Sequence, residues 1–380
     1  MIRKPLIRLA VMALGLGCAC AASAANYFST VLIQGLHSPR QLAFGPDGSL
    51  YVTEAGVASG SGPSTILRGE TQTYTTSGSI TRYANGSATR VFTGLPSIYG
   101  ATSLDVVGPQ GIAFGPLGLP AIAIGAGVDL TVRTTDLAPV GINLAQLRLP
   151  AGNTADLGAF EFANNPAGGA RDSDPWHVAA LGDGSWLVTD AGGNSLLHVA
   201  QDGTTTLVAS FASRALGGPG PTEPVPTGVA VGPDGAYYVA ELTGFPFVPG
   251  AARIYRIAPG GSPTIFATGF TMISDIAFAP DGTLYALEYD SNGLLAPGSQ
   301  GALWKLNPDG SRTLVFSDGL ENPSGLAIHD GAFYISDFGH SSTDGEVVRI
   351  AAVPEPETWA LMLAGVGVVG FVRRRSRARG

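Results

Sequence analysis

Six copies of one phrase run through this chain, and they constrain its fold more than any other feature. Each copy has an apolar run, a short turn and a second run in which apolar and polar residues alternate, as in "QLAFGPDGSLYVTEAG" at 41–56. This pattern predicts a β-hairpin, and Asp-Gly is a favoured turn pair for it. The copies can be aligned on one alanine each: Ala43, Ala113, Ala179, Ala230, Ala277 and Ala327.

Two further short apolar runs follow most copies, for example "ARIYRIA" and then "TIFATGF". Four strands per unit and a period near 50 residues are typical of propeller blades. The last unit has only three runs, and the segment 28–36 matches the missing fourth. We therefore expect an all-β, six-bladed propeller of four-stranded blades, the last closed by the N-terminal strand. The second copy is irregular, with Leu117-Gly118 in place of Asp-Gly and a long insertion over 129–170.

Composition supports a turn-rich β fold and excludes one class of partner. The chain has 54 Gly and 27 Pro in 380 residues, only 13% charged residues and a net charge of -8. Eight of its 21 basic residues lie in the two terminal segments. The remaining surface is strongly acidic and repels phosphate backbones, so we expect no nucleic-acid partner.

The N-terminus has the three parts of a secretory signal peptide. A basic start precedes an apolar run from Leu9 to Leu16, and small residues stand at 22–24, so we expect cleavage by signal peptidase after Ala24. The only cysteines, Cys18 and Cys20, fall inside this segment. The mature chain then has no disulfide and no cysteine-based metal site.

The C-terminus resembles a PEP-CTERM sorting signal, which is recognised by an exosortase in exopolysaccharide-producing Gram-negative bacteria. Three features carry the resemblance: the triad Pro354, Glu355 and Pro356, the apolar stretch from Trp359 to Val372, and an arginine cluster that starts with Arg373, Arg374 and Arg375. The apolar stretch is expected to be a transmembrane helix that anchors the chain transiently before the tail is removed. We expect a signal peptide over 1–24, a propeller over 25–352 and a sorting signal over 353–380, with export to the cell envelope, cell surface or extracellular matrix.

The propeller itself resembles the ScyD/ScyE family of secreted bacterial propellers, which is related in fold to the NHL-repeat and SMP-30/gluconolactonase-like propellers. The resemblance covers about residues 30–351 and is carried by "LHSPRQLAFGPDGSLYVTEAG", "DPWHVAALGDGSWLVTDAGGNSLLHVAQDG" and, most specifically, "ELTGFPF" at 241–247. It implies a secreted propeller with no established catalytic residue. The family takes its name from genes associated with the sheath pigment scytonemin, a role that the resemblance does not transfer.

An acid ends the second run of five of the six copies. These acids are Glu54, Asp190, Glu241, Glu288 and Asp337, while the second copy has Gly125 there. Because each acid ends the second strand of its blade, we expect all five to lie at the same end of the propeller. They can act as pins that accept backbone N–H groups of a neighbouring turn, or some of them can hold a hard cation such as Ca²⁺, which binds oxygen ligands.

The first strand of each copy starts with residues that differ between blades. Three and two positions before the anchor alanines stand Arg40, Gln110, Trp176, His177 and Asp275, which we expect at the mouth of the propeller. A cation, an aromatic ring, an imidazole and carboxylates can bind a sugar or another polar ligand, and a solvated rim is the alternative interpretation.

Signatures of catalysis are weak. The chain has no G-x-S-x-G elbow and no H-E-x-x-H motif. His177 beside Asp275 or Asp190 is a conceivable general base, but nothing in the sequence places a nucleophile. Two functions stay open, with the first favoured: a binding or scaffold protein of the cell surface or exopolysaccharide matrix, and a secreted hydrolase, lactonase or pigment-modifying enzyme that uses the polar mouth, with Ca²⁺ as a possible cofactor.

Overall fold

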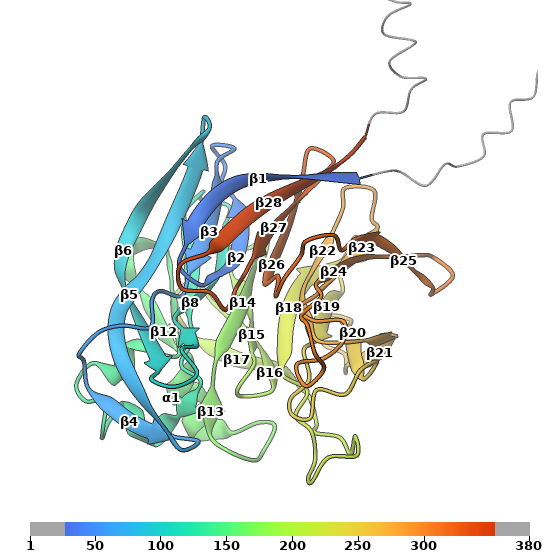
Figure 1. The fold of residues 1–380 in the computed structure, drawn as a ribbon. Helices are drawn as coiled ribbons and strands as arrows, with labels where there is room; N and C mark the ends of the chain where they lie inside the picture. Colours follow the sequence, from blue (N-terminus) through green and yellow to red (C-terminus); the bar gives the residue numbers. More distant parts are fainter. Residues whose placement is uncertain (1–26, 354–380) are drawn as a thin grey trace, which may run out of the picture. The chain divides into compact units, whose positions relative to one another are not determined.

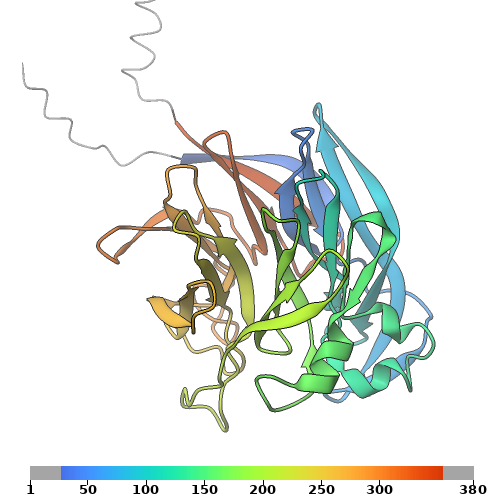
Figure 2. The ribbon, with the colours of Figure 1, turned by 180° about the vertical axis from the view of Figure 1, so that it is seen from behind.

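A computed structural model of the chain describes residues 27–353, apart from the side chain of Ala151. In the unit Tyr27–Ala351, six β-sheets of four or more strands are arranged around a ring, and one two-stranded sheet lies beside them (Figures 1 and 2). The predicted six-bladed propeller is therefore confirmed. The predicted signal peptide and sorting signal lie outside the described residues, except for the first residue of the latter. Within 27–353, no helix is long and apolar enough to cross a membrane, and the apolar stretch from Trp359 lies beyond this range.

Blades 1 to 3 are formed by consecutive strands. Blade 1 contains β2 (Pro39–Phe44), β3 (Leu50–Glu54), β5 (Glu70–Ala84) and β6 (Ser87–Gly100), with β4 (Ser64–Leu67) and β7 (Val106–Val107) beside them. Blade 2 contains β8 (Pro109–Phe114), β9 (Pro120–Ile124), β11 (Gln146–Arg148) and β12 (Thr154–Asp156). Blade 3 contains β14 (Pro175–Ala180), β15 (Trp186–Asp190), β16 (Ser195–Val199) and β17 (Thr205–Ser210).

Blades 4 to 6 repeat this order and close the ring. Blade 4 contains β18 (Pro226–Val231), β19 (Tyr237–Glu241), β20 (Ala252–Ile257) and β21 (Thr264–Phe270). Blade 5 contains β22 (Ile273–Phe278), β23 (Leu284–Glu288), β24 (Ala302–Leu306) and β25 (Arg312–Phe316). Blade 6 contains β26 (Gly325–His329), β27 (Ala332–Asp337), β28 (Gly345–Ala352) and β1 (Tyr27–Leu36).

The innermost strands β2, β8, β14, β18, β22 and β26 each contact the next one around the ring. The direction of these strands distinguishes the two ends of the propeller. We call the end where these strands begin the entry face and the end that carries their hairpin turns the turn face. Each second strand returns to the entry face, as the pairing of Pro39 with Glu54 shows.

The long insertion expected in blade 2 over 129–170 forms ordered elements. It contains β10 (Val128–Asp129), three short 3₁₀ helices and α1 (Leu157–Asn164), while β13 (Asp172–Ser173) pairs with β10. The 3₁₀ helices are η1 (Leu130–Arg133), η2 (Gly141–Asn143) and η3 (Pro150–Gly152). Asp156 caps α1 by accepting the backbone N–H of Ala159 at 2.8 Å. The helix packs against β13 at the entry face (Figure 1).

The N-terminal strand seals the last blade, as the sequence predicts. β1 lies along β28 (Figure 1), which makes blade 6 a four-stranded sheet from the two ends of the described chain. Ile33 and Leu36 are buried in one apolar cluster with Leu42 and Val52 of blade 1 and Val347 of β28. Closure therefore joins blade 6 to blade 1 by packing as well as by strand pairing.

Truncation of Ile33 should open this closure. Ile33 is 4% exposed, so Ile33→Ala should lower the free energy of unfolding by about 2–5 kcal/mol, measured by urea denaturation. Val31→Ala on the same strand is the matched control, because Val31 is 43% exposed. Equal effects of the two substitutions would contradict the role given to β1.

Candidate functional site

Two residues predicted at the mouth, His177 and Asp275, meet a third side chain, Gln41, across the centre of the ring. Gln41, His177 and Asp275 come from blades 1, 3 and 5, and they are 8%, 7% and 0% exposed. His177 Nε2 lies 3.0 Å from Asp275 Oδ1 and 2.6 Å from Gln41 Nε2. Since these blades are not neighbours in the ring, the contacts cross the channel. We call Gln41, His177 and Asp275 the channel layer.

Glycine makes this layer possible. The equivalent positions of blades 2, 4 and 6 are Gly111, Gly228 and Gly325. A Cβ on Gly228 would lie 2.6 Å from the backbone N of Ile276 and 2.9 Å from Asp275 Oδ1. Large polar side chains thus alternate with glycines around the ring, and the glycines leave the space that the polar groups fill.

The layer also ties neighbouring blades together. Gln41 Oε1 accepts the backbone N–H of Ile112 at 2.8 Å, and Asp275 Oδ2 accepts that of Leu326 at 2.8 Å. Gln41 therefore presents its amide N–H₂ group to His177. Because an amide nitrogen only donates, His177 Nε2 accepts from Gln41 or donates to Asp275, and does not do both at once.

Arg40, Gln110 and Trp176 lie together at the entry face. Arg40 donates from Nε to Gln110 Oε1 at 2.9 Å, from Nη2 to the carbonyl of Val106 at 2.8 Å and from Nη1 to the carbonyl of Gly339. Its guanidinium lies 5.9 Å from the centre of the Trp176 ring. The guanidinium is therefore engaged by protein groups and bridges blades 1, 2 and 6.

Blades 4 to 6 have small hydroxyl residues at the position that Arg40 occupies in blade 1. Each hydroxyl donates to a backbone carbonyl of the next blade: Thr227 to Ile273 at 2.6 Å, Ser274 to Pro323 at 2.8 Å and Ser324 to Pro39 at 2.7 Å. These direct blade-to-blade hydrogen bonds were not anticipated from the sequence. A hydroxyl recurring three positions before the anchor alanine was the available signal.

Four of the five repeated acids hold the connector that brings the chain from the preceding blade. Each accepts a backbone N–H just before an innermost strand: Glu54 from His37 at 2.7 Å, Asp190 from Asp174 at 2.7 Å, Glu288 from Thr271 at 2.6 Å and Asp337 from Glu321 at 3.0 Å. All five acids are at most 1% exposed. Each acid contacts its own blade and the connector that enters it, so the five carboxylates do not converge on one shared site.

Three of these acids form an ion pair with an arginine: Glu54 with Arg90, Glu241 with Arg214 and Glu288 with Arg312. Glu241 accepts two hydrogen bonds from Arg214, at 2.5 and 2.8 Å, and one from the Tyr255 hydroxyl at 2.7 Å. Burial alone would raise the pKa of Glu54, but hydrogen bonds from Arg90, Thr81 and His37 outweigh it and hold this pKa below its ordinary value. These pairs are charge-assisted and buried, so removal of one partner is costly.

Blade 2 has Gly125 in place of an acid, and Asp174 of blade 3 supplies a carboxylate at this position. Asp174 Oδ1 occupies the space next to Gly125 and accepts the backbone N–H of Ala126 at 3.2 Å. Burial and the nearby Asp190 raise the pKa of Asp174 to about 6. Within residues 27–353, no group of three or more His, Cys, Asp or Glu side chains is placed to share a metal ion. A calcium site remains a prediction.

A buried carboxyl group without a partner lies beside Asp190. Glu161 on α1 is 1% exposed, and neither of its side-chain oxygens has a hydrogen-bond partner among the described residues. Burial and the Asp190 carboxylate raise the pKa of Glu161 to about 7, although Arg171 lowers it. Burial, Asp174 and Asp190 likewise raise the pKa of Asp172 to about 8. No repeated pattern points to Glu161, because this residue lies in the irregular insertion of blade 2.

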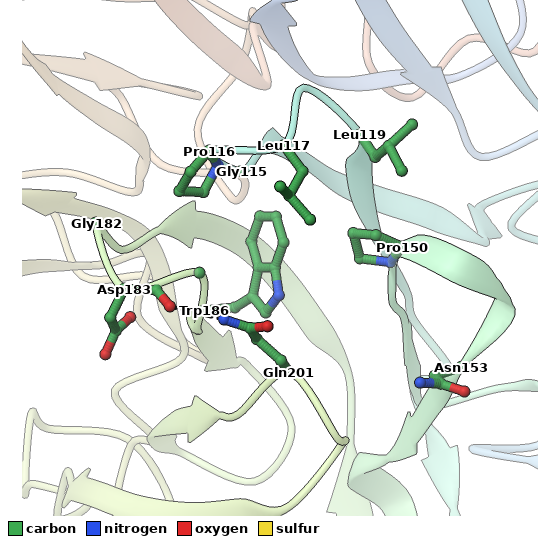
Figure 3. A pocket seen from close by; sticks show the side chains of 11 residues that line it. Gly115, Pro116, Leu117, Leu119, Pro150, Asn153, Gly182, Asp183, Trp186 and Gln201 are labelled. Atoms are coloured by element: carbon green, nitrogen blue, oxygen red, sulfur yellow. Dashed lines mark hydrogen bonds between the residues drawn. The ribbon is translucent and has the colours of Figure 1, made fainter.

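The turn face carries an open pocket between blades 2 and 3 (Figure 3). It has a volume of about 380 Å³, which is within the range of small-molecule sites. The Trp186 ring lies among Pro116, Leu117, Pro150 and Gln201 in this view. This pocket is at the opposite end of the propeller from the predicted mouth, and sequence reasoning missed it.

Comparisons with known proteins agree with the fold and with one terminal motif. Residues 352–377 match the family model for the PEP-CTERM protein-sorting motif. The chain is 29% identical over 184 residues to virginiamycin B lyase from Nocardia farcinica, which is 47% of this chain and 55% of that protein. The match thus spans about half the length of that relative.

Solved structures with the same architecture are more distant. A gluconolactonase from Xanthomonas campestris is 12% identical, with 88% of this chain and 93% of that chain covered and a TM-score of 0.52. A streptogramin B lyase structure is 14% identical, with 87% and 100% covered and a TM-score of 0.51. These likenesses show the fold alone. The chain is a six-bladed β-propeller that carries a PEP-CTERM sorting motif, which indicates export and sorting by an exosortase.

The uncompensated Glu161 should make stability depend on pH. The pKa of the Glu161 carboxyl group is raised in the folded state, from 4.5 to about 7. Its contribution to the stability of the fold is therefore complete below pH 4.5 and is lost as the pH rises through 7. We expect the free energy of unfolding in urea to fall by about 2 kcal/mol between pH 5 and 8 on this account. Glu161→Gln should flatten the slope.

Glu70→Gln is the control for this pH experiment. Backbone N–H groups of Ser103 and Thr102 lower the pKa of Glu70. The Glu70→Gln variant should therefore still lose stability above pH 5, as the wild-type protein does. Equal pH slopes in the wild-type protein and in Glu161→Gln would contradict the assignment.

Proposed function

We propose that this chain is an exported binding or scaffold protein of the cell surface or extracellular polysaccharide matrix. The sorting motif at 352–377 supports delivery to the envelope of a Gram-negative bacterium. The quoted segments that resemble ScyD/ScyE propellers support a secreted propeller of that kind, and the resemblance does not transfer a role in pigment synthesis. Exosortase is then the processing partner, and a matrix polysaccharide is the ligand.

The channel layer is the observation that carries this proposal. His177 and Asp275 are the side chains at the predicted mouth best suited to proton transfer, and both are buried and hydrogen-bonded across the ring. Arg40 is likewise engaged with the backbone carbonyls of Gly339 in blade 6 and of Val106 in its own blade. These groups join strands to one another, whereas the open pocket at the turn face has the partly apolar lining of a binding site, with Asp183 as its one charged residue.

A secreted enzyme is the second candidate. The observation in its favour is the 3.0 Å contact between His177 Nε2 and Asp275 Oδ1, since a carboxylate can orient an imidazole as a general base. The similarity over half the length of a virginiamycin B lyase gives this candidate a reaction class to test. Ca²⁺ would enter such an enzyme as a cofactor, and a shift in melting temperature between Ca²⁺ and EDTA would reveal it.

Retention in the matrix tests the proposed function. In the producing bacterium, the protein should cosediment with isolated extracellular polysaccharide. A variant with Pro354, Glu355 and Pro356 replaced by alanine should instead stay in the membrane fraction, because sorting fails. Equal distribution of the two proteins between fractions would contradict sorting, and a wild-type protein recovered only in the free medium would contradict matrix binding.

Turnover assays decide between the two candidates. We expect the purified protein to leave D-glucono-1,5-lactone and a type B streptogramin unchanged. His177→Gln, which keeps a hydrogen-bonding side chain in the channel, should retain cosedimentation with the polysaccharide. Turnover by the wild-type protein that is lost in His177→Gln, with the melting temperature unchanged, would replace the binding proposal by the enzyme.

A further inference from the structure

The pocket at the turn face continues into a longer groove. A second pocket of about 520 Å³ adjoins it and shares Leu119, Pro150 and Asn153 with it. The two together run from the turns of blade 3, across blade 2, to Phe92 on the outer strand of blade 1. We call this combined surface the blade 2 groove. Its elongated form suits a linear ligand better than a single small molecule.

The departure of blade 2 from the repeat creates the lip of the groove. In blade 1, Asp47 of the hairpin turn accepts the backbone N–H of Ser49 at 3.0 Å. The equivalent residues of blade 2 are Leu117 and Leu119, which are 81% and 48% exposed. Leucine cannot stabilise the turn in this way, and exposing two leucines costs solubility. A ligand that covers them accounts for their presence.

The rest of the lining is rich in amide side chains that are held in place. Asn143, Gln146 and Gln201 donate to the backbone carbonyls of Val140, Ile142 and Asp183 at 3.0, 2.6 and 2.7 Å. Each bond uses one N–H and fixes the amide, so at Gln146 and Gln201 an acceptor oxygen and a second N–H remain for a ligand. Asn153 adds a fourth amide. Such preorganisation reduces the entropic cost of binding.

The charge of the lining excludes highly charged ligands. Arg148 and Asp183 are the only charged residues that line the two pockets, and they cancel. Asp183 is also engaged, because it accepts the backbone N–H and the hydroxyl of Ser185 at 2.9 and 2.6 Å. An anionic polymer would meet a chain of net charge -8 with one arginine in the groove.

From these observations we infer that the blade 2 groove binds a linear neutral polysaccharide. Sugar rings present apolar C–H faces, which fit Leu117, Leu119 and Pro150, and vicinal hydroxyls, which pair with the donor and acceptor of an amide. The inference rests on the proposed function, because it names the ligand class and the surface that retain the protein in the matrix.

Affinity electrophoresis of the purified protein tests the inference. The probes are gels that contain glucomannan, mixed-linkage β-glucan or pullulan, with alginate as an anionic comparison. At least one neutral polymer should retard the protein, and alginate should not. The double variant Leu117→Asp/Leu119→Ser rebuilds the turn of blade 1 and should weaken binding at least tenfold. Gln201→Ala should weaken it to a similar extent.

Two controls separate binding from folding. Leu295→Ser alters another exposed leucine, which is 66% exposed and lies in a blade 5 loop at the entry face, and it should bind like the wild-type protein. The groove variants should melt at the wild-type temperature. If they fail to fold, Asn153→Ala and Gln146→Ala serve in their place, and full retention of binding in these would overturn the inference.

The outcomes distinguish this inference from the proposed function. A protein that cosediments with its own matrix and keeps full binding in every groove variant binds elsewhere, so the inference fails while the proposed function stands. Retardation by no neutral polymer, or stronger retardation by alginate, overturns the ligand class. Binding of a proline-rich peptide with no binding of any sugar would assign the groove to a protein partner.

Discussion

The contact of Gln41, His177 and Asp275 across the channel is the constraint on which the rest of this propeller depends. Three polar side chains from alternate blades meet where six strands converge, and glycines in the intervening blades leave room for them. Gln41 Oε1 and Asp275 Oδ2 also accept backbone N–H groups of neighbouring strands. Buried polar groups that are satisfied in this way specify one arrangement of the strands, since an unpaired buried group is costly.

Around this layer, polar side chains join the blades in two ways. Hydroxyls of Thr227, Ser274 and Ser324 donate to the next blade. The repeated acids hold the connectors that enter each blade, such as Asp190 with the N–H of Asp174. The features that recur from blade to blade therefore support the scaffold. Where the repeat breaks, at the hairpin turn and insertion of blade 2, the molecule gains exposed leucines, ordered amides and a groove.

The sequence predicted the fold well because the fold follows from local signals. Turn pairs such as Asp47-Gly48 and alternating apolar residues define hairpins, and the missing fourth strand of the last unit identified the segment 28–36 as the closing strand. In the structure, the residues predicted at the mouth lie together at the entry face. Their interactions were not predictable, because the distance across the channel depends on how non-neighbouring strands pack. The burial of Glu161 and the position of Asp174 beside Gly125 were not predictable either. Both depend on an insertion that has no counterpart in the other blades.

The free energy of unfolding of Gly228→Ala, measured in urea, tests the channel layer most directly. An added Cβ would lie within 2.9 Å of Asp275 Oδ1 and closer to the backbone of Ile276, so we predict a loss of about 1–3 kcal/mol from overpacking. Gly220→Ala, where an added Cβ meets nothing within 4 Å, should be neutral or slightly stabilising. Equal stability of the two variants would show that the channel has free space at this level and would contradict the account.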